Sequence, residues 1–451
     1  MVDENTLLFL AVILLISWLV LRPARQIPPG DEPVRGHDLC WFVMDNQIPF
    51  IINAFQIMDD ISLDDARRIV ADRMVAKQPR LRNKVVFRGG RPYWTPDTNF
   101  ALENHVYVDT DAQVRSEKEL QAYIDSVYTR NMDPNRPLWE MILLPNYLDG
   151  KCVLVSRFHH VVGDGIALVT MVFKAIDAPP AAARAPVKVG QSGSTLALVK
   201  NLRNNVSAAV GQLLPHDISP YRPPRLSGQV RVAWSQPVPL AEVKFIKNTF
   251  GCSINDVVVA CVAAGLRAYL EKTGGLKDTD RVRASLPVNI RAAKGNDVPL
   301  ENYFGIVYFG FPVHEADRLK RLELVKSRAA AMKASVEPHL TLLGLSLIAN
   351  LPMWLAKPVL HFMSSKATLV FSNVPGLQEV CSFGGKDLHE LHFFAPAGVL
   401  PISISVLSYA QGVSCNIAVD KDACSDPDFL AHNFVAELNA FHALAKAKAT
   451  S

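Results

Sequence analysis

The chain has 451 residues, of which 49% are hydrophobic and 20% are charged, and its formal net charge is +4. Such a chain can bury one large core or two ordinary ones, and its length favours two domains. Basic residues are spread among acidic ones and do not cluster with aromatic side chains, so the composition argues against a nucleic-acid partner.

The first predicted element is an apolar segment, Leu7–Leu21, in which Ser17 is the one polar residue. It is short, since a membrane-spanning helix usually needs about 20 residues and at least about 17. Arg22 and Arg25 follow it, whereas a cleavable signal peptide carries its positive charges before the apolar stretch. We therefore expect residues 1–30 to be a single-pass membrane anchor that leaves a cytosolic catalytic body, in a thin endoplasmic reticulum bilayer. The alternative is a buried or monotopic helix.

Residues 31–178 are predicted to form a first α/β domain. The spacing of apolar residues predicts a helix over 63–76, and two short runs between 84 and 94 predict a hairpin. The apolar run 152–158 predicts a buried strand. Apolar residues at helical spacing then begin at Ile166, so the intervening residues lie between a strand and a helix.

These intervening residues, His159-His160-Val161-Val162-Gly163-Asp164-Gly165, carry the strongest chemical signal. Neighbouring side chains on a strand point to opposite faces, so His159 and His160 cannot both serve one reacting centre and form a poor metal chelate. An imidazole with a pKa of roughly 6.5 suits proton abstraction from an alcohol near neutral pH. Asp164 is the predicted helix N-cap, where its carboxylate can accept backbone N–H bonds or pair with a bracing cation. Gly163 and Gly165 permit backbone angles and close approaches that larger residues resist.

A crossover linker is predicted at 179–229, where the composition shifts to Ala, Pro, Ser, Asn and Arg, and a second α/β domain at 230–451. In the second domain we expect helices at 240–249, 254–270 and 429–445, and strands at 402–406 and 413–419. The mixed order of helices and strands fits an α/β sandwich.

A second apolar region, Leu340–Leu360, is interrupted by polar residues and by two prolines, Pro352 and Pro358. The interruptions argue against a clean membrane span. Composition alone does not separate a lipid-facing hairpin from a buried core segment, so both interpretations stay open.

The sequence lacks the motifs of several other enzyme classes. There is no G-x-S-x-G elbow, no G-x-G-x-x-G and no P-loop motif. His389-Glu390-Leu391-His392 lacks the i, i+4 spacing of a zinc-protease helix, so no metal is expected there. The seven cysteines lack C-x-x-C spacing, and Cys152 and Cys252 lie in apolar surroundings, so we expect buried, reduced thiols that do not react.

The run 159–165 matches the HHxxxDG signature of the CoA-dependent acyltransferase superfamily. The chain resembles one branch of it, the wax ester synthase/diacylglycerol acyltransferase family, from about Gly36 to about Leu444. Motifs that carry this resemblance are Pro137-Leu138-Trp139, Ser253-Ile254-Asn255-Asp256-Val257, Leu286-Pro287-Val288-Asn289-Ile290-Arg291, Glu301-Asn302-Tyr303-Phe304-Gly305, Ser372-Asn373-Val374-Pro375-Gly376, and Ile402–Tyr409 followed by Asp420. Glu301 stands where the family has glycine.

The resemblance implies two similar domains with an active-site tunnel between them. It implies transfer of a long-chain acyl group from acyl-CoA to a fatty alcohol, giving a wax ester, or to diacylglycerol, giving triacylglycerol. His160 is then the general base, while His159 and Asp164 keep the loop in shape. Acyl-CoA is a co-substrate, and no permanently bound cofactor is expected.

The oxyanion of the tetrahedral intermediate needs fixed donors. Asn255 is one candidate, although it is read equally well as a polar contact at a helix N-terminus. The hydroxyls of Ser403 and Ser405 are further candidates, but a solvated strand face explains them better. Pro137-Leu138-Trp139 is expected to pack rather than react.

Both acceptors partition into lipid, so membrane lipid is an expected partner and lipid droplets are a possible site of product. The alternatives are an acyltransferase that acts on another hydroxyl or amine, and a catalytically silent lipid-binding protein.

Overall fold

The computed structural model describes residues 27–34, 36–44, 48–177, 217, 219–277, 280–291, 298–348, 351 and 353–450. The predicted anchor helix Leu7–Leu21 and most of the predicted linker 179–229 lie outside these residues. Both therefore stay predictions.

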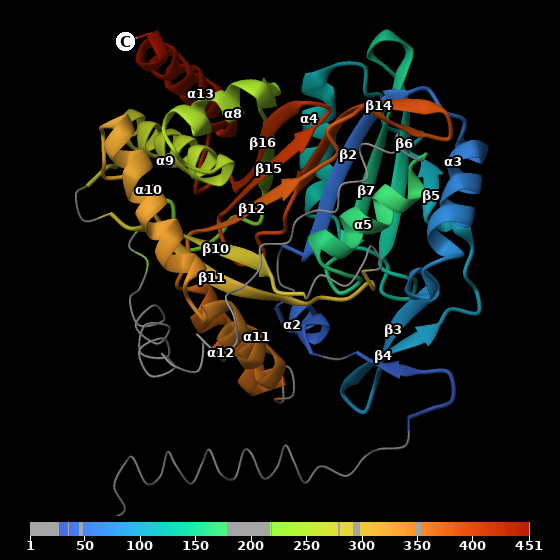
Figure 1. Ribbon diagram of the computed structural model, residues 1–451. Coiled ribbons are helices and arrows are strands. Elements are labelled where there is room, and N and C mark those ends of the chain that lie inside the picture. The colour runs from blue at the N-terminus through green and yellow to red at the C-terminus, as the bar shows by residue number, and fades with distance from the viewer. Residues whose placement is uncertain are drawn as a thin grey trace, which may run out of the picture.

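A six-stranded sheet forms the core of the first half of the protein (Figure 1). Helices α3 (Leu63–Val70) and α5 (Gly165–Ala175) pack on one face of it, and α4 (Glu117–Tyr128) packs on the other. In sheet order, its strands are β13 (Cys381–Phe383), β14 (Lys386–Phe394), β2 (Ile51–Asp59), β7 (Lys151–His159), β6 (Trp139–Tyr147) and β5 (Val106–Val108).

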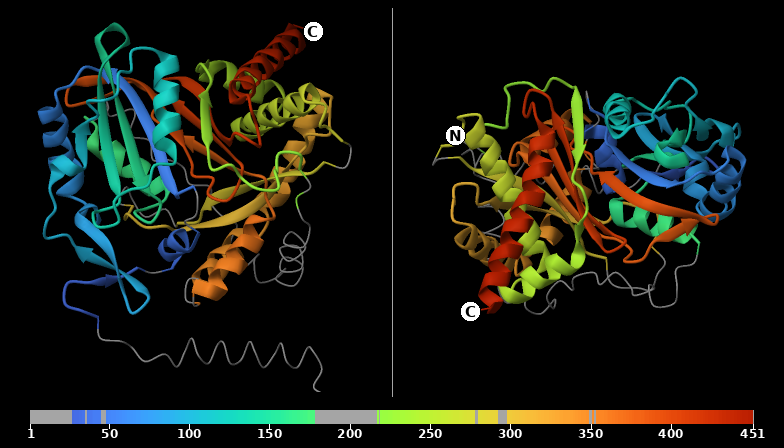
Figure 2. Two further views of the ribbon diagram at one scale, coloured as in Figure 1. Left: turned by 180° about the vertical axis from the view of Figure 1, so that it is seen from behind. Right: turned by 90° about the horizontal axis from the view of Figure 1, so that it is seen from above.

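A seven-stranded sheet forms the core of the second half (Figure 2). Its strands run in the order β11 (Phe304–Phe311), β10 (Val282–Asn289), β12 (Leu369–Pro375), β15 (Ile402–Tyr409), β16 (Gly412–Asp420) and β8 (Val230–Trp234), and β9 (Val238–Pro239) also pairs with β16. The helices packed on its core are α8 (Leu240–Thr249), α9 (Ile254–Lys272), α10 (Arg318–Lys333) and α13 (Pro427–Thr450).

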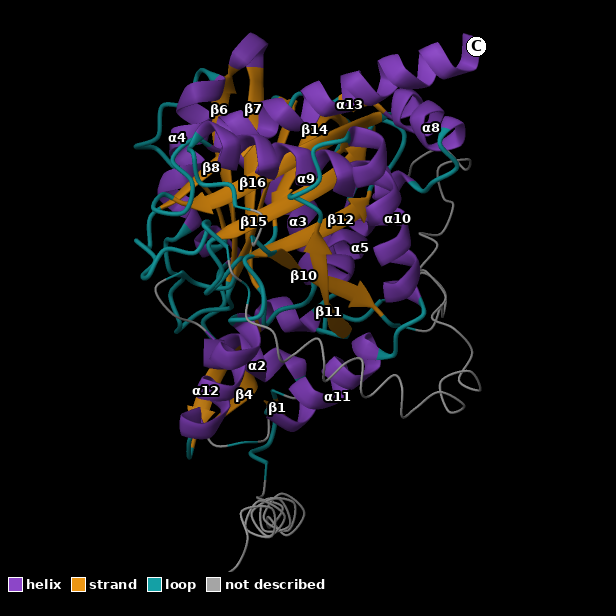
Figure 3. Cartoon of the chain, turned by 90° about the vertical axis from the view of Figure 1, so that its left-hand side faces the viewer, coloured by secondary structure: helices purple, strands orange, loops and turns teal. Residues whose placement is uncertain are grey.

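A three-stranded sheet and three short helices gather at one end of the molecule (Figure 3). These elements are β1 (Glu32–Pro33), β4 (Arg91–Pro96), β3 (Asn83–Arg88), α2 (His37–Met44), α11 (Glu337–Ile348) and α12 (Met353–Ser364). Four single turns complete the described elements: a π turn at Ala71–Val75 and 3-10 turns at Pro79–Arg82, Leu102–Asn104 and Leu148–Gly150.

The helices and strands predicted from apolar spacing are confirmed, including the hairpin β3–β4 and the pair β15–β16. The predicted division of the chain into domains stays a prediction. Strands β13 and β14 come from the 230–451 segment, yet β14 pairs with β2 in the sheet of the first half. The two halves are therefore joined by a strand as well as by packing.

The interpretation of Ser403 and Ser405 as a solvated strand face is wrong. Both side chains are buried, because β15 is covered on both faces. The Ser403 hydroxyl donates to the carbonyl of Ala395 at 2.6 Å, and the Ser405 hydroxyl accepts from the Ala395 N–H at 3.0 Å. Their polar groups hold the segment that follows β14 and do not point to water.

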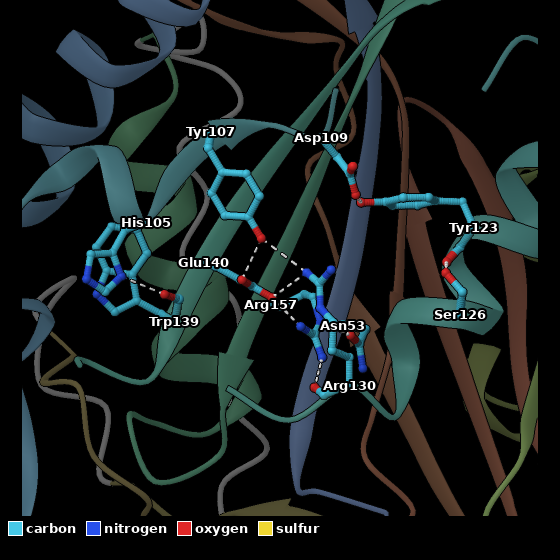
Figure 4. A network of polar contacts seen from close by, with 10 residues as sticks. All are labelled: Asn53, His105, Tyr107, Asp109, Tyr123, Ser126, Arg130, Trp139, Glu140 and Arg157. Atoms are coloured by element: carbon cyan, nitrogen blue, oxygen red, sulfur yellow. Dashed lines mark hydrogen bonds and ion pairs between the residues drawn. The ribbon is translucent and has the colours of Figure 1, made fainter. Parts of the chain in front are cut away.

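A line of polar side chains crosses the six-stranded sheet from β2 to β5 (Figure 4). Arg157 on β7 is fully buried, forms an ion pair with Glu140 on β6, and donates to Asn53 on β2 at 3.1 Å. Glu140 also accepts from Tyr107 on β5 at 2.8 Å and from Arg130 at 3.0 Å. Burial opposes ionisation, but Arg157 and Arg130 hold the pKa of Glu140 below its ordinary value. The network compensates the buried Arg157 charge in the strand that leads to His160.

All seven cysteines are free thiols, and six of them are buried. Burial raises the pKa of Cys152 and of Cys252 to about 11. Both thiols therefore stay protonated at neutral pH, as expected of cysteines that do not react.

Taken singly, none of the described helices is long and apolar enough to cross a membrane. The pair α8 and α9 meets that test only when the two are combined across a 99° bend. Most of α9 is buried in the core of the second half.

Candidate active site

The two histidines lie where β7 ends, and they contact different aromatic side chains. The His159 ring stacks on Phe42 with centroids 5.2 Å apart, and its Nδ1 accepts a 3.1 Å hydrogen bond from the N–H of Val161. The His160 ring lies 4.2 Å from the ring of Trp41 and 6.0 Å from that of Phe304. The structure thus separates the two imidazoles, as strand alternation predicts.

His160 lines an apolar cavity to which both halves of the protein contribute. The cavity volume is about 100 Å³, the space of roughly three water molecules. First-half residues in its wall are Cys40, Trp41 and Phe50. Second-half residues in its wall include Ser285, Phe304, Tyr308, Leu345, Leu360, Met363, Val370, Ala395, Ala397 and Leu400.

Burial controls the protonation of His160. It lowers the pKa of this imidazole to about 4, although the nearby Asp164 carboxylate and Asn302 side chain favour the charged form. The Nδ1 atom is buried and makes no regular hydrogen bond with the described residues. The imidazole of His160 is therefore neutral at physiological pH.

Asp164 holds the loop that carries His160. One oxygen accepts from the N–H of Ala167 at 3.0 Å, which caps α5, and the other accepts from the N–H of Tyr303 at 3.0 Å. The second oxygen also lies 2.8 Å from Nη1 of Arg291 in an ion pair that is almost fully buried. The predicted N-cap and bracing cation are both present, and the cation comes from the N-x-R motif.

Asn302 and Asp38 form a second brace, which the sequence did not indicate. The Asn302 side-chain amide donates to the carbonyl of His160 at 2.7 Å and to Asp38 at 2.7 Å. Arg80 reaches Asp38 at 3.0 Å and also donates to the carbonyl of Val162 at 3.3 Å. Burial raises the pKa of Asp38 to about 6, against the effects of Arg80 and Asn302. Asn302 stands in a motif quoted from the sequence, whereas nothing in the sequence marked Asp38.

The two remaining predicted site residues, Gly165 and Asn255, do not line the cavity that holds His160. Gly165 begins α5, and an added Cβ there would meet no atom within 4 Å, so the fold itself does not require glycine. Asn255 is exposed in the first turn of α9, where its side chain accepts a hydrogen bond from Asn373. It does not line the cavity that holds His160. Its role as an oxyanion donor stays a prediction.

Trp139 packs, as expected for this motif. It is 2% exposed, its Nε1 donates to the carbonyl of Leu81 at 2.8 Å, and its ring stacks on His105 (Figure 4). The serines Ser403 and Ser405 do not line the cavity, but they hold Ala395, which does.

A larger, open cleft of about 780 Å³ adjoins Asp38 and Asn302 and is also lined by Arg80, Tyr303 and His339. His160 is not among its lining residues. The smaller cavity is the candidate reacting centre, because His160, the predicted base, lies in its wall. Among the described residues, no group of three or more His, Cys, Asp or Glu side chains is arranged to hold a metal ion.

Solved structures share this fold. A wax ester synthase/diacylglycerol acyltransferase from Marinobacter aquaeolei VT8 matches with a TM-score of 0.63 at 19% identity, over 91% of this chain and all of that chain (100%). The starter condensation domain of rhizomide synthetase RzmA, a mutant in complex with C8-CoA and Leu-SNAC, matches with a TM-score of 0.60 at 12% identity, over 92% of this chain and 95% of that one.

Sequence relatives point to one family. Wax ester synthase/diacylglycerol acyltransferase 4 of Arabidopsis thaliana is 27% identical over 81% of this chain and 82% of its own length. "Probable diacyglycerol O-acyltransferase tgs1" of Mycobacterium tuberculosis H37Rv is 26% identical over 76% of this chain and 79% of its own. The family model of the wax ester synthase/diacylglycerol acyltransferase catalytic domain matches residues 56–216, and that of the WS/DGAT C-terminal domain matches residues 300–442. The chain belongs to the wax ester synthase/diacylglycerol acyltransferase family.

Proposed function

We propose that this protein transfers a long-chain acyl group from acyl-CoA to the hydroxyl of a fatty alcohol or a diacylglycerol, with His160 as the general base. As a member of its family it is an O-acyltransferase of the kind that makes wax esters or triacylglycerol. The observation that carries the assignment to His160 is its neutral imidazole in the wall of an apolar cavity built from both halves.

The reaction needs one base and no covalent intermediate on the enzyme. The acceptor oxygen attacks the thioester carbonyl carbon while the imidazole of His160 takes the hydroxyl proton. The resulting tetrahedral oxyanion collapses, and the carbon–sulfur bond breaks. The imidazolium then returns the proton to the leaving thiolate, so that the ester and free CoA are the products.

The environment of His160 suits this step. Its low pKa keeps the imidazole able to accept a proton at neutral pH. Hydrogen bonds fix the backbone of His160 on both sides of its Cα. Its N–H donates to the carbonyl of Phe50 at 2.7 Å, and its carbonyl accepts from the side chain of Asn302. The Asp164–Arg291 pair fixes the far end of the same loop. Such positioning removes much of the entropic cost of bringing base and hydroxyl together.

Acyl-CoA as the donor is supported by the condensation domain of the same fold whose structure contains C8-CoA. CoA acts as a co-substrate here, and the proposal includes no resident cofactor. The apolar wall of the cavity suits an acyl chain or a long alcohol.

The membrane anchor remains part of this proposal. The apolar run Leu7–Leu21 with its following arginines would hold the protein to a membrane, with the endoplasmic reticulum and lipid droplets as the expected locations. Such an anchor would place the enzyme where both lipid-soluble acceptors are concentrated.

Purified protein supplied with labelled palmitoyl-CoA and a panel of acceptors tests the assignment. We expect ester and free CoA with hexadecanol or dioleoylglycerol. Transfer to a sterol or an amine instead would replace the proposed acceptor. Absence of CoA release with every acceptor would support the silent lipid-binding alternative.

A further inference from the structure

The helices α11 and α12 carry large apolar side chains on their outer sides. We define the α11–α12 outer face by Leu343, Leu347, Trp354 and Phe362, which are 58%, 53%, 75% and 51% exposed. The two leucines are one helical turn apart on α11, and Trp354 and Phe362 are two turns apart on α12. Each pair therefore forms a stripe along its helix, and stripes of this kind are typical of an interaction surface.

The inner sides of the same helices reach the proposed active site. Leu345 of α11 and Leu360 and Met363 of α12 line the cavity that holds His160. Leu345 and Leu360 also belong to a small buried cluster that includes Cys40. The interpretation as a core segment therefore applies to the inner side of the hairpin, and the lipid-facing interpretation stays a prediction for its outer side. A pair of helices about 10 Å thick separates the outer face from the cavity.

The charge on the two helices is suited to anionic headgroups. Lys357 and His361 are exposed on α12 beside Trp354 and Phe362. Over residues 337–366 the one acidic residue is Glu337, and its side chain is buried. On their own helices these apolar side chains are accompanied by exposed basic residues and by no exposed acid, a pattern typical of helices that lie in a membrane interface. Leu343, at one edge, also lines the open cleft that Glu32 and Glu301 line.

Residues 1–26 join the described chain at this end of the molecule. The described chain begins at Ile27 and enters β1, which lies at the same end as α11 and α12 (Figure 3). Five residues separate the apolar run Leu7–Leu21 from Ile27. Fully extended, these residues span at most about 20 Å. A membrane that held Leu7–Leu21 would therefore lie close to the outer face.

We propose that the α11–α12 outer face docks on a lipid surface and delivers the lipid-soluble substrate to the His160 cavity across the α11–α12 wall. The delivery step rests on the proposed function, whereas the docking step does not. The occupant is a bilayer or a lipid-droplet monolayer containing anionic lipid. Small displacements of α11 and α12 in that surface would open the cavity toward the phase in which the acceptor is dissolved.

Docking is tested with the full-length chain carrying Trp18→Phe, so that the tryptophan of the apolar run does not contribute. Vesicles of phosphatidylserine and brominated phosphatidylcholine should quench the Trp354 emission, because bromine quenches on contact. The quenching should disappear in Trp354→Phe. Buried tryptophans such as Trp94 and Trp139, each 2% exposed, should not contribute.

Two other occupants would overturn the proposal. If the run Leu7–Leu21 or a second copy of the chain covers the outer face, Trp354 stays unquenched when vesicles are added. In the first case deletion of residues 1–26 shifts the Trp354 emission of the vesicle-free protein to the red. In the second case sedimentation shows a dimer that the substitutions Leu347→Ser and Phe362→Ser dissociate.

Delivery is tested with the triple variant Leu347→Ser/Trp354→Ser/Phe362→Ser. We expect at least about a tenfold loss of transfer to dioleoylglycerol presented in vesicles, because interfacial binding scales with buried apolar area. Transfer from octanoyl-CoA to water-soluble 1-hexanol should be unchanged. Equal rates on vesicle substrate in the variant and the wild type would overturn the proposal.

The matched control changes three exposed apolar side chains on other parts of the chain, Leu148→Ser/Leu319→Ser/Val380→Ser. These are 45%, 43% and 51% exposed, and the control should keep wild-type activity on both substrates. Failure of the proposed function looks different, because wild-type protein would then acylate neither 1-hexanol nor dioleoylglycerol.

Discussion

The side-chain amide of Asn302 donates a 2.7 Å hydrogen bond to the backbone carbonyl of His160, 142 positions away in the sequence. The same amide nitrogen donates to Asp38, which Arg80 contacts. The loop that carries His160 is therefore held by the second half of the protein and by α2 together. Placement of the imidazole depends on this contact as much as on the end of β7.

Replacement of Asn302 by alanine should reduce turnover. We expect kcat to fall about 10- to 100-fold, because small displacements of a catalytic group have effects of this size. The buried Asp38 carboxylate also loses a donor, so the melting temperature should fall. Steady-state kinetics and thermal unfolding measure the two effects. Wild-type kcat in a correctly folded variant would contradict the positioning role.

Asp164 and Arg291 should behave as a unit in a double-mutant cycle. Each single alanine variant leaves a nearly buried charge without its partner, which typically costs about 3–5 kcal/mol of stability. The double variant should cost less than the two single losses added together. Denaturant unfolding of the four proteins gives the coupling free energy. Additive losses would mean that the 2.8 Å pair contributes nothing.

The pH dependence should reflect a histidine that is hard to protonate. Burial lowers the pKa of His160 to about 4, so the acid limb of kcat/KM should have its midpoint well below 6.5. In the unfolded chain this imidazole titrates near 6.5. Its contribution to stability is therefore complete above pH 6.5 and is lost as the pH falls from 6.5 toward 4. A midpoint at or above 6.5 would contradict a pKa of His160 that burial lowers.

Removal of Glu140 should destabilise the first half of the protein. In Glu140→Ala the fully buried Arg157 loses its ion-pair partner, at an expected cost of about 3–5 kcal/mol. The matched control is Glu103→Ala, an exposed glutamate, which should stay within about 0.5 kcal/mol of the wild type. Chemical unfolding measures the free energy of unfolding of both variants. Equal stabilities would mean that the network in Figure 4 tolerates an uncompensated arginine.

Much of the site could be predicted because its chemistry is local. The strand, loop and helix around His159–Gly165 follow from apolar spacing, and the N-cap role of Asp164 follows from its place before α5. The separation of His159 from His160 follows from strand geometry alone. These inferences needed no information about distant parts of the chain.

The contacts that complete the site join residues far apart in sequence. Arg291 and Asn302 stand in recognisable motifs, but nothing local says that they meet the loop of His160. Asp38 had no signal, because a single acidic residue in a short helix is usually solvated. Nothing in the local sequence of β14 reveals which sheet it joins, and it joins the sheet of the first half. The prediction of a solvated face for the serines of β15 is wrong, because alternation of polar and apolar residues does not distinguish a solvated face from a second buried face.

The most direct test of the account is the rate of CoA release by purified His160→Ala with palmitoyl-CoA and hexadecanol. The variant should fold normally, because the lost ring has a buried Nδ1 atom without a regular hydrogen-bond partner among the described residues. We predict a loss of about 100-fold or more, which is the usual contribution of a general base, in variant protein that remains folded. Retention of most of the wild-type turnover in folded variant protein would contradict the assignment of His160 as the base.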